Sequence, residues 1–265
     1  MTVTIEGQEI EVIDDHCHVG SSWALTWFSF PSATWTNEST EKLISDMDEA
    51  GVDKVCAFST ANPHTDYTEN NRLVAEMARN YPNRVIPFVR INPHFGAESV
   101  DKVYDEFVRN QSFKGVKLHP QLDAYTANNR FLLGPVLEGA SKHRVPIEIH
   151  TGEVYTASPI RVGDIAEEYT DVNFIMAHLS VLEWEEAILV AKKHDNIVVE
   201  TSTQAFILAL RLAVSELGPE RVLFGCDYPF QPHLFELEKL TRHCKFTADE
   251  LKHILSGNIK RLTRT

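Results

Sequence analysis

KVCAFST (residues 54–60) and NFIMAH (residues 173–178) are the two stretches of sequence that indicate the fold most clearly. Both are nearly continuous in apolar residues, which is typical of strands buried on both faces of a parallel sheet. Similar short apolar runs recur along the chain and predict further strands. The predicted strands are Glu11–His16, Lys54–Ser59, Val85–Ile91, Gly115–His119, Pro146–His150, Asn173–His178, Ile197–Thr201 and Arg221–Cys226.

Amphipathic stretches with the helical period follow the predicted strands. They cover Glu41–Ala50, Glu69–Tyr81, Ala97–Asn110, Phe131–His143, Arg161–Tyr169, Leu182–His194, Phe206–Leu217 and Leu234–His243, and a further helix is predicted from Ala248 to Leu255 with Thr247 as its N-cap. This alternation predicts an α/β fold in which residues 1–265 form a single-domain (β/α)8 TIM barrel. The rival architecture is a doubly wound open sheet, but its usual Gly-rich phosphate loop does not occur in the sequence.

The composition limits the kinds of partner. The 265 residues are 43% hydrophobic and 24% charged, values that are typical of a soluble globular enzyme. The sequence has 25 Lys and Arg residues and 38 Asp and Glu residues, which gives a net charge of −13. An acidic surface repels phosphate backbones and anionic lipids, so we expect no nucleic acid and no membrane partner. The expected partner is a small-molecule substrate.

The cysteines and the chain ends suggest a compartment. Cys17, Cys56, Cys226 and Cys244 are scattered and form no CxxC pair, which favours free thiols in a reducing environment. No apolar run is long enough to span a bilayer, and the first residues carry no secretory signal. We therefore expect a cytoplasmic protein.

One predicted connection is unusually long. Gly20–Asn37 follows the first strand and contains Trp23, Trp27, Phe28, Phe30 and Trp35. Long loops of this kind are often lids or binding loops, and an aromatic plug over the barrel mouth is an equal alternative. The same aromatic side chains would also suit a homo-oligomer interface.

Polar residues gather where the predicted strands end. They are Asp14, His16 and His18 with the first strand, Arg90 with the third, Lys117 and His119 with the fourth, and His150, His178 and Asp227 with the fifth, sixth and eighth. Residues two apart in a strand point to the same side, so Asp14, His16 and His18 are expected to share a face. The carboxyl ends of barrel strands converge on one mouth, where we expect these side chains to meet.

The residue types suit a metal site. Neutral imidazoles and a carboxylate bind a borderline divalent ion such as Zn²⁺, and a catalytic site leaves one coordination position for water. Such an ion lowers the pKa of its water from 15.7 to about 7, and a nearby carboxylate can accept the proton. We expect one divalent ion, Zn²⁺ before Mn²⁺, with a second ion left open.

A structural role is the competing interpretation for every histidine. We favour it for the isolated ones, namely His64, His94, His143, His194, His233, His243 and His253. His16 and His18 are different, because two inward imidazoles on one strand are costly to bury without a partner. Cys17 lies between them but points the other way, and Cys226 has the same relation to Asp227, so packing is expected for both thiols.

Several motifs together resemble the amidohydrolase superfamily. IDDHCH (residues 13–18) is similar to its I-D-x-H-x-H signature, and the likeness continues through GVKLHP (115–120), PIEIHTG (146–152), FIMAHLS (174–180) and RVLFGCDYP (221–229). ILSGNIKRL (254–262) is similar to the terminal helix of the amidohydrolase-related branch, which includes aminocarboxymuconate-semialdehyde decarboxylase-like enzymes and many hydrolases. HxH alone is a weak motif, but the whole set in barrel order is a strong one.

The resemblance implies a role for each matching residue. His16, His18 and His150 correspond to metal ligands, and Asp227 to an aspartate that contacts metal and handles protons. His178 corresponds to a second metal ligand in binuclear members and to an acid/base or substrate contact in mononuclear ones. Lys117 is open between a carbamylated bridge, a cationic substrate contact and support of the barrel mouth. Asp14 is expected to support the ligands from behind.

Three functions compete. The first is a metal-dependent hydrolase that uses metal-activated water on a small amide, ester or lactone, with Asp227 and His178 moving protons. The second is a metal-dependent non-oxidative decarboxylase of a small carboxylic acid. Arg90 and Lys117 could bind a carboxylate in either case, and His119 is a further candidate contact to metal or substrate. A catalytically silent barrel predicts lost ligands and is disfavoured because every ligand position is filled. The compact chain favours hydrolysis.

Overall fold

Eight parallel strands form one sheet whose order follows the sequence from β3 to β10. The computed structural model describes residues 3–5, 7–20, 40–61 and 64–265. The strands are β3 (Ile13–Val19), β4 (Lys54–Ser59), β5 (Val85–Arg90), β6 (Gly115–Leu118), β7 (Ile147–Ile149), β8 (Phe174–Met176), β9 (Ile197–Glu200) and β10 (Val222–Leu223). The long aromatic connection Gly20–Asn37 lies outside the described residues from position 21 onward.

Backbone hydrogen bonds join the first strand of the sheet to the segment that follows the last. The Asp15 N–H donates to the carbonyl of Phe224 at 2.9 Å, and the His18 N–H donates to the carbonyl of Tyr228 at 2.7 Å. These bonds bring β3 beside the chain after β10, so the sheet closes on itself. The predicted (β/α)8 barrel is confirmed.

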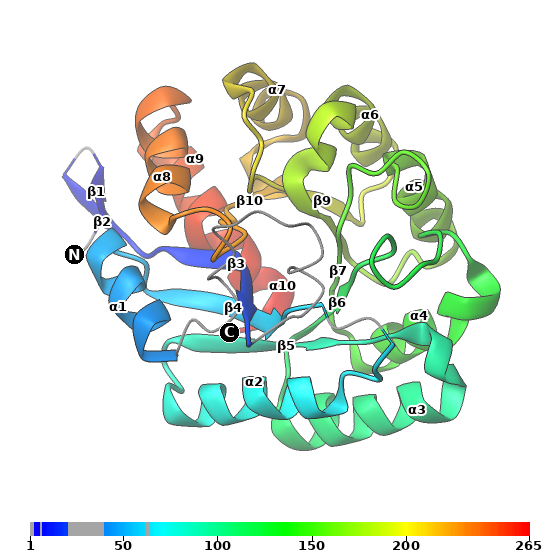
Figure 1. Cartoon of the computed structure of the whole chain (residues 1–265). Coiled ribbons are helices and arrows are strands. Elements are labelled where there is room, and N and C mark those ends of the chain that lie inside the picture. Colours follow the sequence, from blue (N-terminus) through cyan, green and yellow to red (C-terminus); the bar gives the residue numbers. More distant parts are fainter. Residues whose placement is uncertain (1–2, 6, 21–39, 62–63) are drawn as a thin grey trace, which may run out of the picture.

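Helices surround the strands as a ring (Figure 1). They are α1 (Thr40–Ala50), α2 (Thr68–Asn80), α3 (Gly96–Val103), α4 (Arg130–His143), α5 (Pro159–Glu168), α6 (Trp184–Lys193), α7 (Ile207–Leu217), α8 (His233–Glu238) and α9 (Ala248–Lys252). The last helix, α10 (Asn258–Thr263), lies behind the strands at the centre of the ring. The N-cap predicted at Thr247 is present as a capping box with Glu250. Within the described residues, no helix combines the length and hydropathy needed to cross a membrane.

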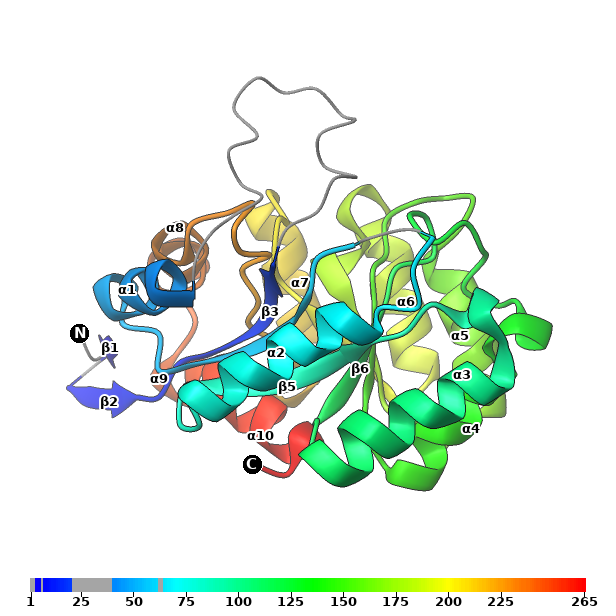
Figure 2. The same cartoon turned by 60° about the horizontal axis from the view of Figure 1, so that its bottom comes forward.

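Strand alternation divides the apolar core into two clusters. In β4, Val55 and Ala57 pack toward the helices, whereas Cys56 and Phe58 belong to the cluster that fills the barrel. Ile259 and Leu262 of α10 join this inner cluster, which closes the end of the barrel opposite the mouth. Figure 2 shows the tip of β3 at the upper end of the barrel and α10 at the lower end.

The same alternation aims polar side chains into the mouth. Val116 and Leu118 of β6 pack outward, so Lys117 between them faces the barrel interior. Ile147 and Ile149 of β7 pack outward in the same way and leave Glu148 facing inward. These inward positions lie near the carboxyl ends of short strands, where the interior changes from apolar to polar.

Two features at the start of the sheet differ from the sequence-based picture. An antiparallel hairpin of β1 (Val3–Ile5) and β2 (Gln8–Ile10) precedes the barrel and was not predicted. The pairing of β3 with β4 shifts register between Asp14 and Cys17, so the alternation that was to align Asp14 with His16 is broken. Asp14 instead accepts from the backbone N–H groups of His16 and Cys226, and its other oxygen lies 3.1 Å from His233 Nε2.

Candidate metal centre

Three donor atoms from opposite ends of the chain form a triangle at the barrel mouth. Nε2 of His16 and Nε2 of His18 lie 3.3 Å apart. Oδ1 of Asp227 lies 3.3 Å from the first nitrogen and 3.1 Å from the second. Ligand atoms bonded to one ion at about 2.1 Å stand about 3.0 Å apart at 90° and about 3.4 Å apart at the tetrahedral angle. The triangle therefore matches three ligands on one face of a single ion.

The protonation of two of these side chains also suits metal binding. Burial lowers the pKa of His18 to about 3, which keeps the imidazole neutral with a lone pair available. Burial tends to raise the pKa of Asp227, but its contacts with His16 and His18 hold that pKa well below the usual value. A neutral imidazole and an ionised carboxylate are the forms that bind a cation.

Two buried carboxylates orient His16 from behind. Its Nδ1 lies 2.9 Å from Oε1 of Glu148 on β7 and 3.2 Å from Oε2 of Glu200 on β9. An Nδ1–H that donates to a carboxylate fixes the tautomer and turns the Nε2 lone pair toward the opposite side. That side is where His18 and Asp227 lie. Metal-ligating histidines commonly have such a carboxylate partner.

The charges around His16 leave a deficit of positive charge. Lys117 and His16 overcome the effect of burial and lower the pKa of Glu148 to about 2, and His16 also keeps the pKa of Glu200 below its usual value. With Asp227, three ionised carboxylates thus face two positive charges, the ammonium of Lys117 and the His16 ring, whose pKa Glu148 and Asp227 raise well above its usual value against the effects of burial and Lys117. A divalent ion at the triangle would balance this charge, so the residues present fit the metal that the sequence predicts.

Lys117 lies beside the His16 corner of the triangle. Its ammonium forms an ion pair with Glu148, lies 3.1 Å from His16 Nε2 and stands 4.5 Å above the Phe58 ring. The Lys117 side chain is therefore paired with a buried carboxylate. The choice between a cationic role and a carbamylated bridge stays a prediction.

His178 occupies a strained turn directly after β8. Four successive residues, His178 to Val181, have φ between 44° and 63°, a left-handed conformation that costs roughly 1–2 kcal/mol per residue. The turn is held by the His178 N–H, which donates to Glu200 at 3.1 Å, and by Gln204, whose amide donates to the Val181 carbonyl at 2.8 Å. This turn places the His178 ring centroid 4.8 Å from that of His16.

His150 contacts His178 and not the three donor atoms of the triangle. Its Nδ1 is 2.9 Å from His178 Nε2, and its Nε2 is 2.7 Å from Glu153 Oε1. Its ring stacks on His119 with the two centroids 3.8 Å apart. The structure thus brings His150, His178 and His119 together beside the triangle, and the role of His150 as a metal ligand stays a prediction.

The family of the chain follows from comparison with known proteins. A family model described as Amidohydrolase matches residues 13–264. The chain belongs to this family. A search of curated proteins found no match.

Solved structures share the amidohydrolase barrel over nearly their whole length. A 5-carboxyvanillate decarboxylase from Sphingomonas paucimobilis has 15% identity and a TM-score of 0.75, covering 96% of this chain and 99% of that one. A dihydroxybenzoic acid decarboxylase from Polaromonas sp. JS666, with bound manganese and the inhibitor 2-nitroresorcinol, has 15% identity and a TM-score of 0.78, covering 96% and 97%. A TIM-barrel protein from Bordetella bronchiseptica has 19% identity and a TM-score of 0.78, covering 96% and 98%.

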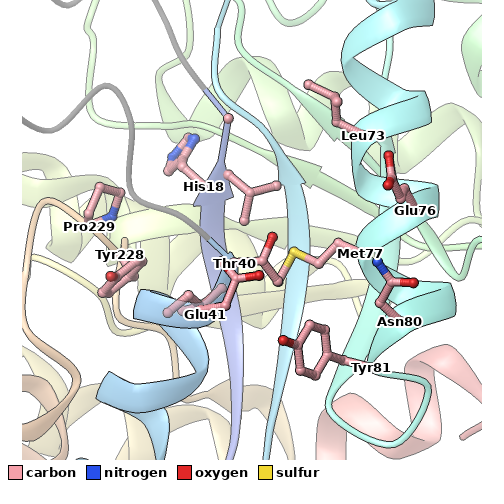
Figure 3. A pocket seen from close by; sticks show the side chains of 13 residues that line it. His18, Thr40, Glu41, Leu73, Glu76, Met77, Asn80, Tyr81, Tyr228 and Pro229 are labelled. Carbon is pink, nitrogen blue, oxygen red and sulfur yellow. The ribbon is translucent and has the colours of Figure 1, made fainter.

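A cavity of 580 Å³ adjoins the candidate metal centre on the side of His18. It lies between α1 and α2 and is also lined by Glu41, Glu76 and Tyr228 (Figure 3). Its two carboxylates disfavour a negatively charged ligand in this cavity. An acidic substrate would therefore be better placed on the Lys117 side of the mouth.

Sequence reasoning missed three carboxyl groups of the amidohydrolase centre. Glu148 and Glu200 orient His16, and Asp15 is buried near both of them. Burial and the charges of Glu148 and Glu200 raise the pKa of Asp15 well above its usual value. The available signal was an acidic residue inside an otherwise apolar short strand, as in IEI (147–149) and IVVE (197–200).

Proposed function

We propose that the chain is a metal-dependent, non-oxidative decarboxylase of a small aromatic carboxylic acid. The observation that carries the proposal is the His16–His18–Asp227 triangle with its charge deficit. The choice of reaction is supported by the structural relatives, two of which are named as decarboxylases of substituted benzoic acids. The chemistry thus follows the second of the functions considered from the sequence.

The walls of the site suit a planar, negatively charged molecule. The half-buried ring of Phe230 stands edge-on to His18 with a centroid separation of 5.5 Å. Such a ring offers an apolar surface for an aromatic substrate. Lys117 adds a positive charge on the inner side, which attracts a carboxylate.

The proposed ion would be held by four protein side chains and would polarise the substrate. His16, His18 and Asp227 would hold one divalent ion, with His150 as a fourth ligand. A bound divalent ion supplies Lewis-acid charge that holds substrate oxygen atoms and draws electron density from the bond that breaks. Zn²⁺ and Mn²⁺ both suit nitrogen and oxygen donors, and a relative was solved with manganese.

Decarboxylation needs a group that delivers a proton, and Asp227 is suited to this role. Decarboxylation replaces the carbon–carboxylate bond by a carbon–hydrogen bond, so one proton must reach the ring carbon as CO2 leaves. Asp227 is ionised and contacts both imidazoles of the triangle, and we assign it the transfer of one proton from solvent to the ring carbon. Burial keeps the pKa of His178 well below its usual value, so neutral His178 can relay or orient that proton.

Hydrolysis of a small amide, ester or lactone is the second candidate. The same triangle and the same two proton carriers would serve it, because Asp227 would accept the proton of the attacking water. The match of the family model over residues 13–264 is compatible with either reaction, since one fold hosts both chemistries.

A two-arm assay tests the proposal. Metal-free protein is reloaded with Zn²⁺ or Mn²⁺ and incubated in D2O with 2,6-dihydroxybenzoate and 5-carboxyvanillate, and separately with a panel of amides, esters and lactones. We expect CO2 release with one solvent deuteron at the carbon that lost the carboxylate. Turnover of the second panel without CO2 from the first would replace the decarboxylase by the hydrolase.

A further inference from the structure

A second group of potential metal ligands lies at the seam of the barrel, where β3 pairs with the chain after β10. Its members are Asp14 of β3, Cys226 in the segment after β10 and His233, the first residue of α8. Each offers one donor atom, and the three atoms lie within 4.8 Å of one another. All three residues are buried, with at most 2% of each exposed. A carboxylate, a thiol and an imidazole are thus gathered away from solvent, and none of them belongs to the triangle described above.

Asp14 is fixed in place and keeps one oxygen for a ligand. Its Oδ1 accepts from the backbone N–H of His16 at 2.9 Å and from that of Cys226 at 2.8 Å. Its Oδ2 lies 3.1 Å from Nε2 of His233. This separation falls in the range of about 3.0–3.4 Å that two donor atoms bonded to one ion show. The carboxylate and the imidazole are therefore spaced as two ligands of one ion.

His233 makes few polar contacts for a buried histidine. Its Nδ1 is buried and lacks a hydrogen-bond partner among the described residues. Its ring is oriented by stacking on Tyr228, with the two centroids 4.8 Å apart. Asp14 is thus the one described side chain that competes for a nitrogen of this ring, and a cation bound between the two groups would replace that single contact.

Cys226 brings a soft donor to the cluster. Its Sγ lies 3.0 Å from the carbonyl oxygen of Gln231. A thiolate and an oxygen on one ion stand about 3.1 Å apart at 90°, given bonds of about 2.3 and 2.1 Å. Burial raises the pKa of this thiol, and a divalent ion that coordinates the sulfur displaces the proton. One sulfur, one nitrogen and two oxygen donors favour Zn²⁺ and disfavour Mg²⁺ and Mn²⁺.

A cavity of 360 Å³ lies beside the cluster, between α1 and α8. Its wall includes His233 and Gln231, together with Asp46 and Glu49 of α1. Lys42 also lines the cavity and forms an ion pair with Asp46. The two helices contact each other and lie side by side at this edge of the barrel (Figure 1). The carboxylates attract cations, so the cavity gives an ion a route to His233 that is separate from the barrel mouth.

We propose that Asp14, Cys226 and His233, with the Gln231 carbonyl, bind a zinc ion that is separate from the catalytic one. The proposal is independent of the reaction that the chain catalyses. Zinc sites with four protein ligands are structural, because no position is left for water. The ion links β3, the chain after β10 and α8. It therefore fastens α8 to the seam and fixes the backbone that carries Asp227, the residue directly after Cys226.

Absorption spectroscopy with Co²⁺ as the only added metal tests the proposal. A thiolate ligand gives Co²⁺ a charge-transfer band in the near ultraviolet, which nitrogen and oxygen ligands do not give, so the triangle is silent. The spectra compare wild type, Cys226→Ser, the His16→Ala/His18→Ala double variant and Cys244→Ser, which removes another buried free thiol as a matched control. We expect the band in all of these proteins except Cys226→Ser. Added Zn²⁺ should abolish the band, and added Mn²⁺ should leave it unchanged.

A further variant, His233→Gln, separates a ligand from a supporting group. It should weaken Co²⁺ binding at the cluster by more than about 100-fold, beyond the usual effect of a group behind the ligands. No band in wild type, an equal band in Cys226→Ser or an unchanged Co²⁺ affinity of His233→Gln would overturn the proposal. Loss of the band from a double variant that circular dichroism shows to be folded would assign the thiolate to the catalytic ion, and would overturn the separate site. Failure to release CO2 would count against the decarboxylase and would leave this result standing.

Discussion

Asp227 combines an unusual backbone conformation with two contacts of its carboxylate. Its backbone has φ of 63°, a left-handed conformation that Asp and Asn tolerate better than most residues. Its carboxylate contacts both His16 and His18. The structure therefore allows a conservative test, because Asn keeps the size, the backbone preference and one acceptor oxygen.

Asp227→Asn should lower kcat by about 10²- to 10⁴-fold, since Asn cannot take up a proton at neutral pH. Much of the metal should remain, because the imidazoles of His16 and His18, together with the proposed fourth ligand His150, would still bind it. Metal content and turnover are measured on the same preparation. A near-normal kcat would disprove the proton-carrying role, and complete loss of metal would make Asp227 chiefly a ligand.

At the residue scale, the sequence predicted the triangle but not the groups behind it. His16, His18 and Asp227 stand in motifs at strand ends, where function is readable from position alone. Glu148 and Glu200 also lie in strands, but a single acidic residue between apolar ones reads as the exposed face of an alternating strand. Only the closed barrel shows that this face is the interior, and that both carboxylates meet at His16 Nδ1.

At the element scale, the turn after β10 is shaped around Glu200. A Cβ atom at Gly225 would overlap the carboxylate of Glu200. That carboxylate accepts from the backbone N–H of His178 and from the Ser202 hydroxyl, and it contacts His16. The absence of a side chain at position 225 thus allows one carboxylate to serve two histidines on different strands.

Gly225→Ala should therefore weaken metal affinity by about 10- to 100-fold, the usual effect of disturbing a group behind the ligands. The matched control is Gly134→Ala in α4, where an added Cβ meets nothing within 4 Å. Competition with a chromophoric chelator gives both affinities. Equal affinity of Gly225→Ala and Gly134→Ala would show that Glu200 does not position His16.

Element boundaries were less predictable than the elements themselves. The first barrel strand was expected at Glu11–His16 and runs from Ile13 to Val19, and the last was expected at Arg221–Cys226 and is reduced to Val222–Leu223. The cause is the seam of the barrel, where β3 shifts register and pairs with the chain beyond β10. Local periodicity contains no information about a partner more than 200 positions away.

At the scale of the whole molecule, the proposed ion ties the two ends of the barrel together. His16 and His18 come from the first barrel strand, and Asp227 follows the last. An ion that binds only the folded barrel stabilises it by about 2.7 kcal/mol at a free concentration of 100 Kd. For a chain of this size the Tm should rise by about 5–10 °C.

Differential scanning calorimetry with and without a chelator measures this effect. The Tm of chelated protein should increase with added Zn²⁺ or Mn²⁺ and should not respond to Mg²⁺, which prefers oxygen ligands. A Tm that is independent of all three ions would contradict the role of the centre as a link across the seam.

The whole barrel could be predicted from sequence, whereas the reaction could not. Repeated strand–helix alternation and the ordered motifs were sufficient for the fold and for the amidohydrolase family. Hydrolysis and decarboxylation need the same ligands, so His16, His18 and Asp227 do not separate them. The difference lies in how the substrate is held, and the complete burial of Arg90, a predicted substrate contact, becomes visible only in three dimensions.

Metal stoichiometry of the His16→Ala/His18→Ala double variant tests the central claim most directly. Purified wild type and variant are incubated with equal Mn²⁺, which a thiolate site disfavours, desalted and measured by inductively coupled plasma mass spectrometry, with His243→Ala as a matched control. The account predicts about one ion per chain for wild type and for the control, and none retained by the double variant. An unchanged stoichiometry in the double variant would contradict it.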